Sequence, residues 1–396
     1  MDYYASNIQL LTDFFKSGCK DEKLLGLELE HFIVDKNGYS VSYYDGIEDL
    51  LKKIQPKIGE PIYSEGHLIG IIGPGLDITL EPAGQFETSI GPCKSLTCLL
   101  EYYNDFLDVI NPVLAEMDFK IVSSGFHPKS SIEDMPMLPK KRYEYMYEYF
   151  NKSGTHGKYM MKGTAATQVS IDYKNEADFI KKYRVANILG PAFALICDNT
   201  KFFQGEPLNS FLFRTEVWNN VDPKRSMVVP GSLDKSFGFS DYAGYIYTMP
   251  PILLMKDNTA FSTGEATNAE LFSGKLLTSE DVEHITTMTF PDVRLKKRIE
   301  IRTGDSLPFN EALAFTALIK GIFYSKENLD YYSSRLLDIT NADVTHAKNE
   351  LIKFGKDYSS ACGKITDFTA ELYNRALTAL KDEASYLLPL KERCYA

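Results

Sequence analysis

The sequence predicts an α+β protein with a mainly antiparallel β-sheet. Short segments in which apolar and polar residues alternate are separated by turns that contain Gly, Asn and Pro, as in strands joined by hairpins. Longer segments with helical spacing lie beside them, and the two kinds do not alternate regularly as they do in parallel βαβ folds. No repeat or low-complexity linker divides the 396 residues, so we expect a single domain, 1–396.

The first third of the chain is predicted to contain helices and paired strands. Apolar residues recur at helical spacing over 6–17, and Gly18 supplies the end of this helix. Residues 25–35 alternate as a strand does, with an Asn-Gly turn into a return over 39–43. The same two periods predict a short helix over 46–54, short strands over 68–72 and 77–80, and a long helix over 96–117.

The remainder is predicted to add strands and then a helical C-terminal part. Strands are expected over 120–125, 166–173 and 294–302, and helices over 175–189 and about 241–247. Helices follow from about 310 to 396, with heptad-like apolar spacing over 312–323 and 372–387.

The bulk composition is that of a soluble globular protein. Apolar residues make up 44% and charged residues 24%, which argues against disorder. A net charge of −11 disfavours nucleic-acid binding, and no apolar stretch approaches the roughly 18 residues that a membrane helix needs. The six cysteines form no CxxC pair or zinc spacing, and the N-terminus does not resemble a signal peptide. We therefore expect a cytoplasmic protein with reduced thiols.

The most informative stretch is 294–302. In a single strand, alternate side chains share a face. One face would then carry Arg294, Lys296, Arg298, Glu300 and Arg302, and the other would carry Leu295, Lys297, Ile299 and Ile301. Four cations in one row repel each other unless anions lie opposite them. This face is therefore either a solvated surface or the lining of a site for a polyanionic ligand.

Carboxylates are concentrated in three strand-like segments. Glu28 and Glu30 share one face of their strand, and Glu300 lies between two isoleucines. Glu81 and Glu87 flank a segment with Pro and Gly, and about 20 Å of extended chain would separate them unless that segment bends. The alternative is an exposed edge strand for the first pair and a surface turn for the second.

If these carboxylates converge, cations must accompany them. Each pair ~4 Å apart would repel by about 4 kcal/mol at an effective dielectric constant of about 20. Hard oxygen ligands without nearby His or Cys favour Mg²⁺, with Mn²⁺ as a substitute, and Mg²⁺ commonly bridges carboxylates and phosphates. Together with the cations of 294–302, these residues would complete a site for a nucleotide triphosphate.

Other motifs for phosphate binding or hydrolysis are missing. The sequence has no GxxxxGK[ST], no GxGxxG that opens a helix and no HExxH. Its six histidines are scattered, so packing or surface roles are expected, and only His156, in the polar loop 153–157, stands out.

Six blocks, in order, resemble the glutamate–cysteine ligases of the plant and proteobacterial type. They are GLELE (26–30), ITLEPAGQFETS (78–89), KGTAATQVSIDY (162–173), FRTEVWNNVDPKR (213–225), FGFSDYAGYIYTMP (237–250) and HITTMTFPDVRLKKRIEIRTGD (284–305). The resemblance runs from about 25 to 310, and the helical part beyond carries no signature. It implies a curved antiparallel sheet that forms a funnel, with helices outside, related to glutamine synthetase.

The resemblance also implies a reaction. Such enzymes use ATP to phosphorylate the γ-carboxylate of glutamate, and the amine of cysteine then displaces phosphate. The product, γ-glutamylcysteine, is the first intermediate on the way to glutathione. The expected partners are small-molecule substrates, and the expected state is a monomer or homodimer.

Site roles carry over by motif. Glu28, Glu30, Glu81, Glu87 and Glu300 look like Mg²⁺ ligands around the ATP phosphates. Arg294 and Lys296 look like neutralisers of phosphate charge. Arg302, with Glu300 one strand period before it, would act in catalysis by stabilising the γ-phosphoryl group as charge spreads in the transition state.

Two further arginines are candidates for substrate binding. Arg214 resembles the arginine that holds a substrate carboxylate, where a planar bidentate donor fits, and Arg184 is a second candidate for that task or for phosphate. Structural salt bridging is the alternative for both. The redox-regulating cysteine pair of plant enzymes cannot be matched to these cysteines, so no disulfide switch is predicted.

The chain departs from the plant-type pattern near the expected acceptor amine. It has Thr-Ala-Ala-Thr at 164–167 in place of a run with Thr-Cys-Thr, Arg-Thr-Gly-Asp at 302–305 in place of Arg-Gly-Ala-Asp, and an extra cation at Arg298. A γ-glutamyl ligase with another amine acceptor is therefore an alternative. A guanidino kinase, whose superfamily shares this sheet, and a nucleotide sensor without turnover are the others.

Overall fold

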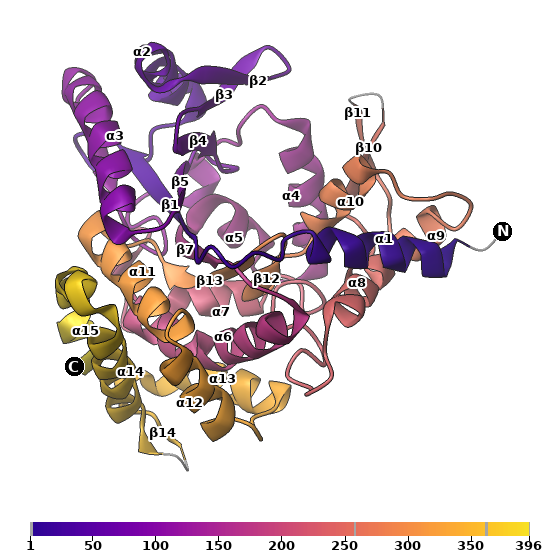
Figure 1. Ribbon diagram of the computed structural model, residues 1–396. Helices are drawn as coiled ribbons and strands as arrows, with labels where there is room; N and C mark the ends of the chain where they lie inside the picture. Colours follow the sequence, from indigo (N-terminus) through magenta and orange to yellow (C-terminus); the bar gives the residue numbers. More distant parts are fainter. Residues whose placement is uncertain (1–2, 257–258, 361–362, 396) are drawn as a thin grey trace.

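The computed structural model describes residues 3–256, 259–360 and 363–395, and one large antiparallel sheet forms its centre. The strands of this sheet are β1 (Leu25–Val34), β2 (Glu60–Ser64), β3 (His67–Ile72), β4 (Leu76–Leu80), β5 (Phe86–Cys93), β6 (Lys120–Val122), β7 (Ala166–Ile171), β12 (Val293–Leu295) and β13 (Ile299–Asp305). Their order is β12-β13-β7-β1-β5-β4-β3-β2, with β6 paired to β1 (Figure 1). The ladders are antiparallel, which confirms a mixed fold with a large antiparallel sheet.

Helices pack on and around this sheet. Their bounds are α1 (Tyr4–Lys16), α2 (Glu48–Ile58), α3 (Leu96–Glu116), α4 (Lys141–Ser153), α5 (Gly157–Gly163), α6 (Glu176–Ile196), α7 (Phe213–Asn219), α8 (Phe239–Thr248), α9 (Asn268–Leu271), α10 (Ser279–Thr286), α11 (Phe309–Phe323), α12 (Lys326–Arg335), α13 (Asn341–Phe354), α14 (Ile365–Leu380) and α15 (Lys391–Tyr395). α3, α6 and α11 contact the sheet, and the C-terminal helices lie outside α6 and α11 (Figure 1). In the described part of the chain, none is long and apolar enough to span a membrane.

Short hairpins and turns complete the fold. The hairpins are β8 (Phe202–Phe203) with β9 (Glu206–Pro207), β10 (Leu253–Lys256) with β11 (Thr259–Ser262), and β14 (Ser359–Ser360) with β15 (Gly363–Lys364). Single helical turns lie at Ile132–Asp134 and Gly355–Asp357, a π-helical turn at Tyr43–Ile47 and a longer 3₁₀ segment at Lys381–Leu390.

Several predicted elements have different extents; the strand expected over 120–125, for example, is β6, which ends at Val122. The return strand expected over 39–43 is a single bridge between Val34 and Ser40. The helix expected over 175–189 continues to Ile196 as α6. The sequence pattern did not predict this end, because most residues of α6 are buried. A helix that is buried on nearly all sides has no amphipathic period to mark its end.

The two faces of the sheet have opposite character. In β1, Leu25, Leu27 and Leu29 are fully buried in the core that also contains residues of α3 and α11. Glu28 and Glu30 alternate with them and lie on the other face, which lines a cavity. The period of two in the sequence thus separates a packing face from a charged face.

The stretch 294–302 is a hairpin, so the prediction of a single strand was wrong. β12 and β13 pair with Arg294 opposite Glu300 and Leu295 opposite Ile299, and 296–298 forms the turn. Cross-strand neighbours share a face, so the charged pair lies on one side and the fully buried apolar pair on the other. Alternation along a single strand correctly predicted that Arg294 and Glu300 share a face. They share it because they pair across the hairpin, not because they lie on one strand.

A tight turn between β4 and β5 brings Glu81 back beside Glu87. The Glu81 amide donates to the Gln85 carbonyl at 2.9 Å, and the Gly84 amide donates to the Glu81 carbonyl at 2.8 Å. Thr79 then lies opposite Glu87 in the ladder. Gly84 has a φ of 84°, which favours a residue without Cβ. The chain therefore bends between Glu81 and Glu87, as it must if both carboxylates are to belong to one cluster.

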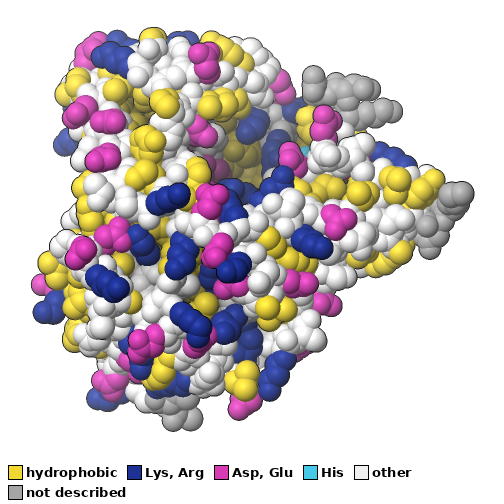
Figure 2. Space-filling model, in the orientation of Figure 1, with side chains coloured by type: hydrophobic (Ala, Val, Ile, Leu, Met, Phe, Trp, Pro, Cys, Tyr) yellow, Lys and Arg dark blue, Asp and Glu magenta, His cyan; other side chains and the backbone are white. Residues whose placement is uncertain are grey.

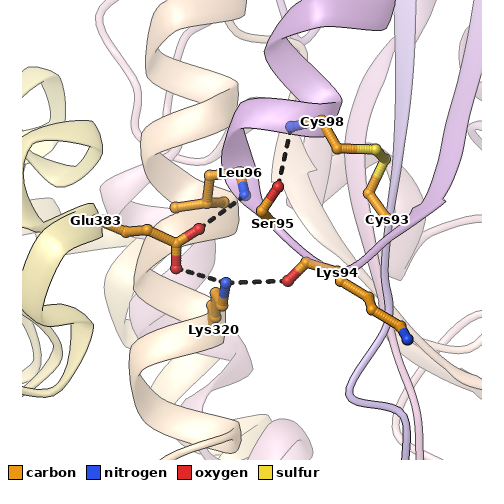
Figure 3. The surroundings of a disulfide bond; sticks show 7 residues. All are labelled: Cys93, Lys94, Ser95, Leu96, Cys98, Lys320 and Glu383. Carbon is orange, nitrogen blue, oxygen red and sulfur yellow. Dashed lines mark hydrogen bonds and ion pairs between the residues drawn. A yellow bond between two sulfur atoms is a disulfide. The ribbon is translucent and has the colours of Figure 1, made fainter.

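The expectation of reduced thiols is wrong for one pair of cysteines. Cys93 at the end of β5 and Cys98 in the first turn of α3 form a disulfide, with a Cα–Cα distance of 5.8 Å (Figure 3). The strand-to-helix turn brings them within bridging distance, although their spacing matches no common motif. Beside this junction, Glu383 accepts hydrogen bonds from the Leu96 amide and the Lys320 ammonium (Figure 3). The start of α3 is thereby tied to the C-terminal helices.

Gly84→Ala is expected to lower the free energy of unfolding by about 1–2 kcal/mol, which is the cost of a left-handed conformation for a residue with Cβ. The added Cβ would meet no atom closer than 3.7 Å, so the strain is confined to the backbone. Urea unfolding measures this loss. Gly66→Ala, with a φ of 85° and open space around it, is the matched control. We expect a similar loss of stability in both variants. Only Gly84→Ala should also slow the ligation that the family resemblance implies, because the turn at Gly84 positions Glu81 and the turn at Gly66 does not. Equal activities would contradict this role.

Candidate active site

The charged segments of the sequence meet at one cavity of about 530 Å³, a volume typical of small-molecule sites. Figure 2 shows this face hollowed between the part that holds α2, β2 and β3 and the part that holds α1 and α10, with Lys and Arg side chains in the hollow. The charged residues that line the cavity are Glu28, Glu30, Glu81, Glu87, Lys140, Arg142, Arg294, Lys296, Arg298 and Arg302. Each comes from a strand of the sheet, from a turn that joins two strands, or from the start of α4.

Glu28 and Glu30 project from β1 and are held by neighbouring strands. Glu30 accepts hydrogen bonds from the Ala166 amide and the Gln168 side chain of β7, each at 2.8 Å. Glu28 accepts one from Arg298 at 3.3 Å. Arg298, whose role the sequence left open, therefore supplies a positive charge beside one of the cavity carboxylates.

Burial and mutual repulsion raise the pKa values of these carboxyls. Desolvation, reinforced by Glu300 and Glu87, raises the pKa of Glu28 to about 7. Desolvation and the charges of Glu81 and Glu87 raise the pKa of Glu30 to about 8, and desolvation with Glu81 raises that of Glu87 to about 7. Part of this cluster is therefore protonated near neutral pH when no cation is bound.

Glu300 lies beneath the cluster as the counter-ion of the hairpin. Its carboxylate is fully buried, and Oε2 accepts hydrogen bonds from Arg294 Nε at 2.6 Å and Arg302 Nη1 at 3.1 Å. The Lys296 ammonium lies 3.7 Å from Oε1. Burial opposes ionisation, but Arg294, Lys296 and Arg302 hold the pKa of Glu300 well below its usual range. Glu300 thus stays ionised near neutral pH, where Glu28, Glu30 and Glu87 are partly protonated.

The carboxylates are neighbours but do not form a preformed metal cage. Within residues 3–256, 259–360 and 363–395, no three or more His, Cys, Asp or Glu side chains are grouped closely enough to hold a metal ion. The donor types still fit a hard divalent cation, because the cavity lining contains carboxylates and no His or Cys. In addition, Glu300 Oε1 is buried and has no hydrogen-bond partner among the described residues.

Arg214 lies one layer behind the cavity. Its Nη1 donates to the Arg302 carbonyl at 3.2 Å, and its side chain lines a small hollow of about 20 Å³. Arg302, Trp218 and Phe290 line both the hollow and the main cavity. Arg214 Nε and Trp218 Nε1 are buried without a hydrogen-bond partner in the described part of the chain. Two such donors around one hollow mark a place for an acceptor group.

Arg184 and His156 lie away from the site. Arg184 is buried on α6, and its guanidinium donates to the carbonyls of Leu233, Leu337 and Ile339. Neither residue lines the cavity or the hollow. The geometry therefore favours a structural role for Arg184, which was the alternative to substrate binding.

The cavity also contains residues that the sequence did not single out, namely Lys140, Arg142, Gln168 and Trp218. Gln168 donates to Glu30 and accepts from Arg302, so it joins the carboxylates to the hairpin. The run Lys-Lys-Arg at 140–142 was the available signal for the two cations. A short basic run usually marks a solvated helix end, and Lys141 at its centre is indeed exposed.

An antiparallel sheet that presents buried carboxylates and cations to one ligand-sized cavity belongs to an enzyme that binds a charged small substrate. The sequence model of glutamate-cysteine ligase family 2 matches residues 24–394. The chain therefore belongs to this family.

Two relatives and one solved structure illustrate the similarity. The chain is 33% identical over 353 residues to a chloroplastic glutamate–cysteine ligase of Arabidopsis thaliana, covering 87% of this chain and 67% of that protein. It is 31% identical over 384 residues to glutamate–cysteine ligase B of Oryza sativa subsp. japonica, covering 94% and 77%. A crystal structure of a glutamate–cysteine ligase from Francisella tularensis with AMP has a similar fold. The TM-score is 0.54 at 11% identity, over 95% of this chain and 82% of that one.

The expectation of a cytoplasmic protein is contradicted by these relatives. Those from Arabidopsis thaliana, Medicago truncatula and rice are named chloroplastic. The expectation depended on net charge, on cysteine spacing and on an N-terminus unlike a signal peptide, and none of these properties distinguishes the cytoplasm from a plastid.

Removing one cavity carboxyl should flatten the dependence of stability on pH. A carboxyl whose pKa is raised in the folded state stabilises that state while protonated, and this contribution is lost as pH rises through the folded pKa. For Glu87 the window runs from 4.5 to about 7. Between about pH 5 and 8, the metal-free wild type should lose roughly 1–2 kcal/mol more stability than Glu87→Gln in urea unfolding. Glu101→Gln, at an exposed position of α3, is the control and should follow the wild type. Parallel curves for all three proteins would contradict the repulsion inferred here.

Proposed function

We propose that this protein catalyses the ATP-dependent ligation of the γ-carboxylate of L-glutamate to the amine of L-cysteine, giving γ-glutamylcysteine, ADP and phosphate. The observation that carries the proposal is the meeting of carboxylates and cations in a chain of this family. Four glutamates and the cationic hairpin line one cavity, and a fifth glutamate lies beneath it.

The reaction has two steps, each with a defined electron flow. A γ-carboxylate oxygen attacks the terminal phosphorus of ATP, the bond to the bridging oxygen breaks, and ADP leaves with the electron pair. The amine of cysteine then attacks the carbonyl carbon of the acyl phosphate, loses a proton, and phosphate leaves. Negative charge moves onto oxygen atoms in both steps, so fixed cations lower both barriers.

The cations of the hairpin are proposed to serve these charges. Arg294 and Lys296 would neutralise the phosphates, and Arg302 would stabilise the transferring phosphoryl group. The support is that Glu300 pairs with all three side chains at the cavity wall, so they are ordered before a ligand arrives. Glu300 contributes to catalysis through this ordering.

The carboxylates are proposed to bind Mg²⁺, for which Mn²⁺ could substitute. Glu28, Glu30, Glu81 and Glu87 would supply oxygen ligands, together with Oε1 of Glu300, which accepts no hydrogen bond from the described residues. Bound Mg²⁺ supplies positive charge that is shared between carboxylate and phosphate oxygens. The raised pKa values of Glu28, Glu30 and Glu87, which follow from burial and mutual repulsion, support such a role, because these groups lack enough positive charge of their own.

Arg214 is proposed to bind a carboxylate of the substrate. The support is the unpaired Nε of Arg214 beside the unpaired Nε1 of Trp218, at a hollow that adjoins the main cavity through Arg302. The hollow has room for about one water-sized group, such as a carboxylate oxygen.

The acceptor and the shape of the sheet are finer parts of this proposal. The funnel that the family resemblance implies is supported by the hollowed face in Figure 2. One observation favours a second candidate, a γ-glutamyl ligase for a different amine. Ala165 and Ala166, where the plant pattern has larger or polar residues, are fully buried, and the Ala166 amide bonds to Glu30. A change at this contact lies close to the proposed chemistry.

Incubation with Mg-ATP, glutamate and a panel of amino acids tests the acceptor. We expect phosphate release that depends on glutamate and is fastest with cysteine, with γ-glutamylcysteine confirmed by mass spectrometry. Glycine, alanine and α-aminobutyrate, which lack the thiol, are the matched comparisons. Release that is no faster with cysteine than with glycine or alanine would reject the cysteine assignment. Release without any ligated product would support phosphoryl transfer alone.

Substitution of two buried arginines separates binding from folding. Arg214→Met should raise KM for glutamate about 10–100-fold, because a charge-assisted hydrogen bond to a carboxylate is lost. Arg184→Met should lower the temperature of unfolding, because three backbone carbonyls lose their donor, and leave KM unchanged. Steady-state kinetics and thermal unfolding of both variants give the comparison. An unchanged KM in Arg214→Met would exclude the proposed contact.

A further inference from the structure

The cations that line the cavity fall into two groups according to their partners. Arg294, Lys296 and Arg302 form ion pairs with Glu300, and Arg298 pairs with Glu28. The remaining two, Lys140 and Arg142, have no carboxylate within 4.0 Å among the described residues. Positive charge that is not already neutralised is thus concentrated at the start of α4, beside the cavity.

Lys140 and Arg142 come from the start of α4. Arg142 donates a hydrogen bond from Nη2 to the Thr287 hydroxyl, a neutral partner, at 3.2 Å. The Lys140 ammonium lies 4.8 Å from the centre of the Tyr143 ring, a cation–π contact that leaves its N–H donors free for a ligand. Lys141 between them is exposed and pairs with Glu144 at 3.1 Å. The helix therefore directs two of three consecutive cations into the cavity.

These two cations repel each other and the hairpin. Burial lowers the pKa of Lys140, and the charge of Arg142 lowers it further. Burial likewise lowers the pKa of Arg142, Tyr143 and Glu81 oppose this effect, and the charge of Arg294 adds to it. Glu81 lies near these cations, because Lys140, Arg302 and Arg142 all lower its pKa, against the rise that burial causes. An anion in this space would relieve the repulsion from both sides, and one with two or more charges would do so more fully.

We propose that Lys140 and Arg142 bind the terminal phosphoryl group of the nucleotide triphosphate, together with Arg302. This inference depends on the proposed function, since that function places ATP in the cavity. A terminal phosphoryl group carries more negative charge than a carboxylate and presents oxygens to several donors at once, which suits a cavity lined by cations from both the hairpin and the start of α4. The neighbouring Glu81, proposed as a metal ligand, adds the oxygen donor that a metal-bridged phosphate needs.

Binding of a non-hydrolysable ATP analogue with Mg²⁺, compared with binding of AMP, tests the assignment by isothermal titration calorimetry. Lys140→Met and Arg142→Met should each weaken binding of the triphosphate analogue about 10–100-fold, because each loses a charge-assisted contact. Both should bind AMP as the wild type does. Lys141→Met is the matched control and should bind both nucleotides normally. Arg142→Lys, which keeps the charge, should lose less affinity for the triphosphate analogue than Arg142→Met. It is also the control for folding, because it changes the same position and keeps a cation there.

Other outcomes would overturn the assignment in recognisable ways. Normal triphosphate affinity in both methionine variants, with a raised KM for glutamate or the amine, would mean that these cations bind a substrate carboxylate. An equal loss for AMP and for the triphosphate analogue would mean that they act on the nucleoside or on the fold. A wild type that binds no triphosphate would instead reject the proposed function, and this inference with it.

Discussion

The buried ion cluster around Glu300 is the interaction on which the site depends. Its carboxylate is surrounded by Arg294, Arg302 and Lys296, all from one short hairpin. Like charges ~4 Å apart repel by about 4 kcal/mol at an effective dielectric constant of about 20, so these cations could not be packed together without an anion. Removing one partner of a buried ion pair typically costs about 3–5 kcal/mol. Glu300 therefore stabilises the hairpin as well as serving any role in chemistry.

The carboxylates above Glu300 show the opposite balance. Burial and mutual repulsion raise the pKa values of Glu28, Glu30 and Glu87, so their ionised forms destabilise the free protein. Replacing them with apolar residues would extend the core and remove this cost. Groups whose charge is unfavourable in the fold but well placed in a cavity are typical of functional sites. The same sheet thus has one face that provides stability and another that reduces it for the sake of binding.

The sequence predicted which residues lie on the charged face of the sheet better than it predicted the strands and turns that carry them. Period-two alternation placed Glu28 and Glu30 on the cavity side because β1 is a regular strand. The stretch 294–302 alternates in sequence as a strand does, but three of its residues form a turn. Arg294 and Glu300 lie side by side only because they pair across the hairpin. Local patterns cannot distinguish these cases, since both give the same order of faces.

Other features depend on contacts that no local pattern contains. Lys140 and Arg142 line the cavity because α4 begins at the cavity that the hairpin also lines, about 150 residues away in the chain, and the basic run alone resembles a solvated helix end. Cys93 and Cys98 meet because a strand ends where a helix begins. Arg184 and Arg214 look equivalent in sequence, and each has one buried donor without a hydrogen-bond partner among the described residues, yet Arg184 bonds to three carbonyls away from the site and only Arg214 lines the hollow beside the cavity. Tertiary placement decides each of these.

The charge arrangement also implies how ligands must bind. In the free protein each sign of charge is partly satisfied by the other, as in the contact between Arg298 and Glu28. A phosphate alone would compete with these carboxylates for the cations, and a divalent cation alone would compete with the cations for the carboxylates. Under the proposed function the ligand carries both charges, and each can take up a contact that the other releases, so metal and nucleotide should each increase the affinity of the other, by the same factor. This reciprocity follows because carboxylates and cations line the same cavity. It would be absent if the cavity contained only the carboxylates or only the cations.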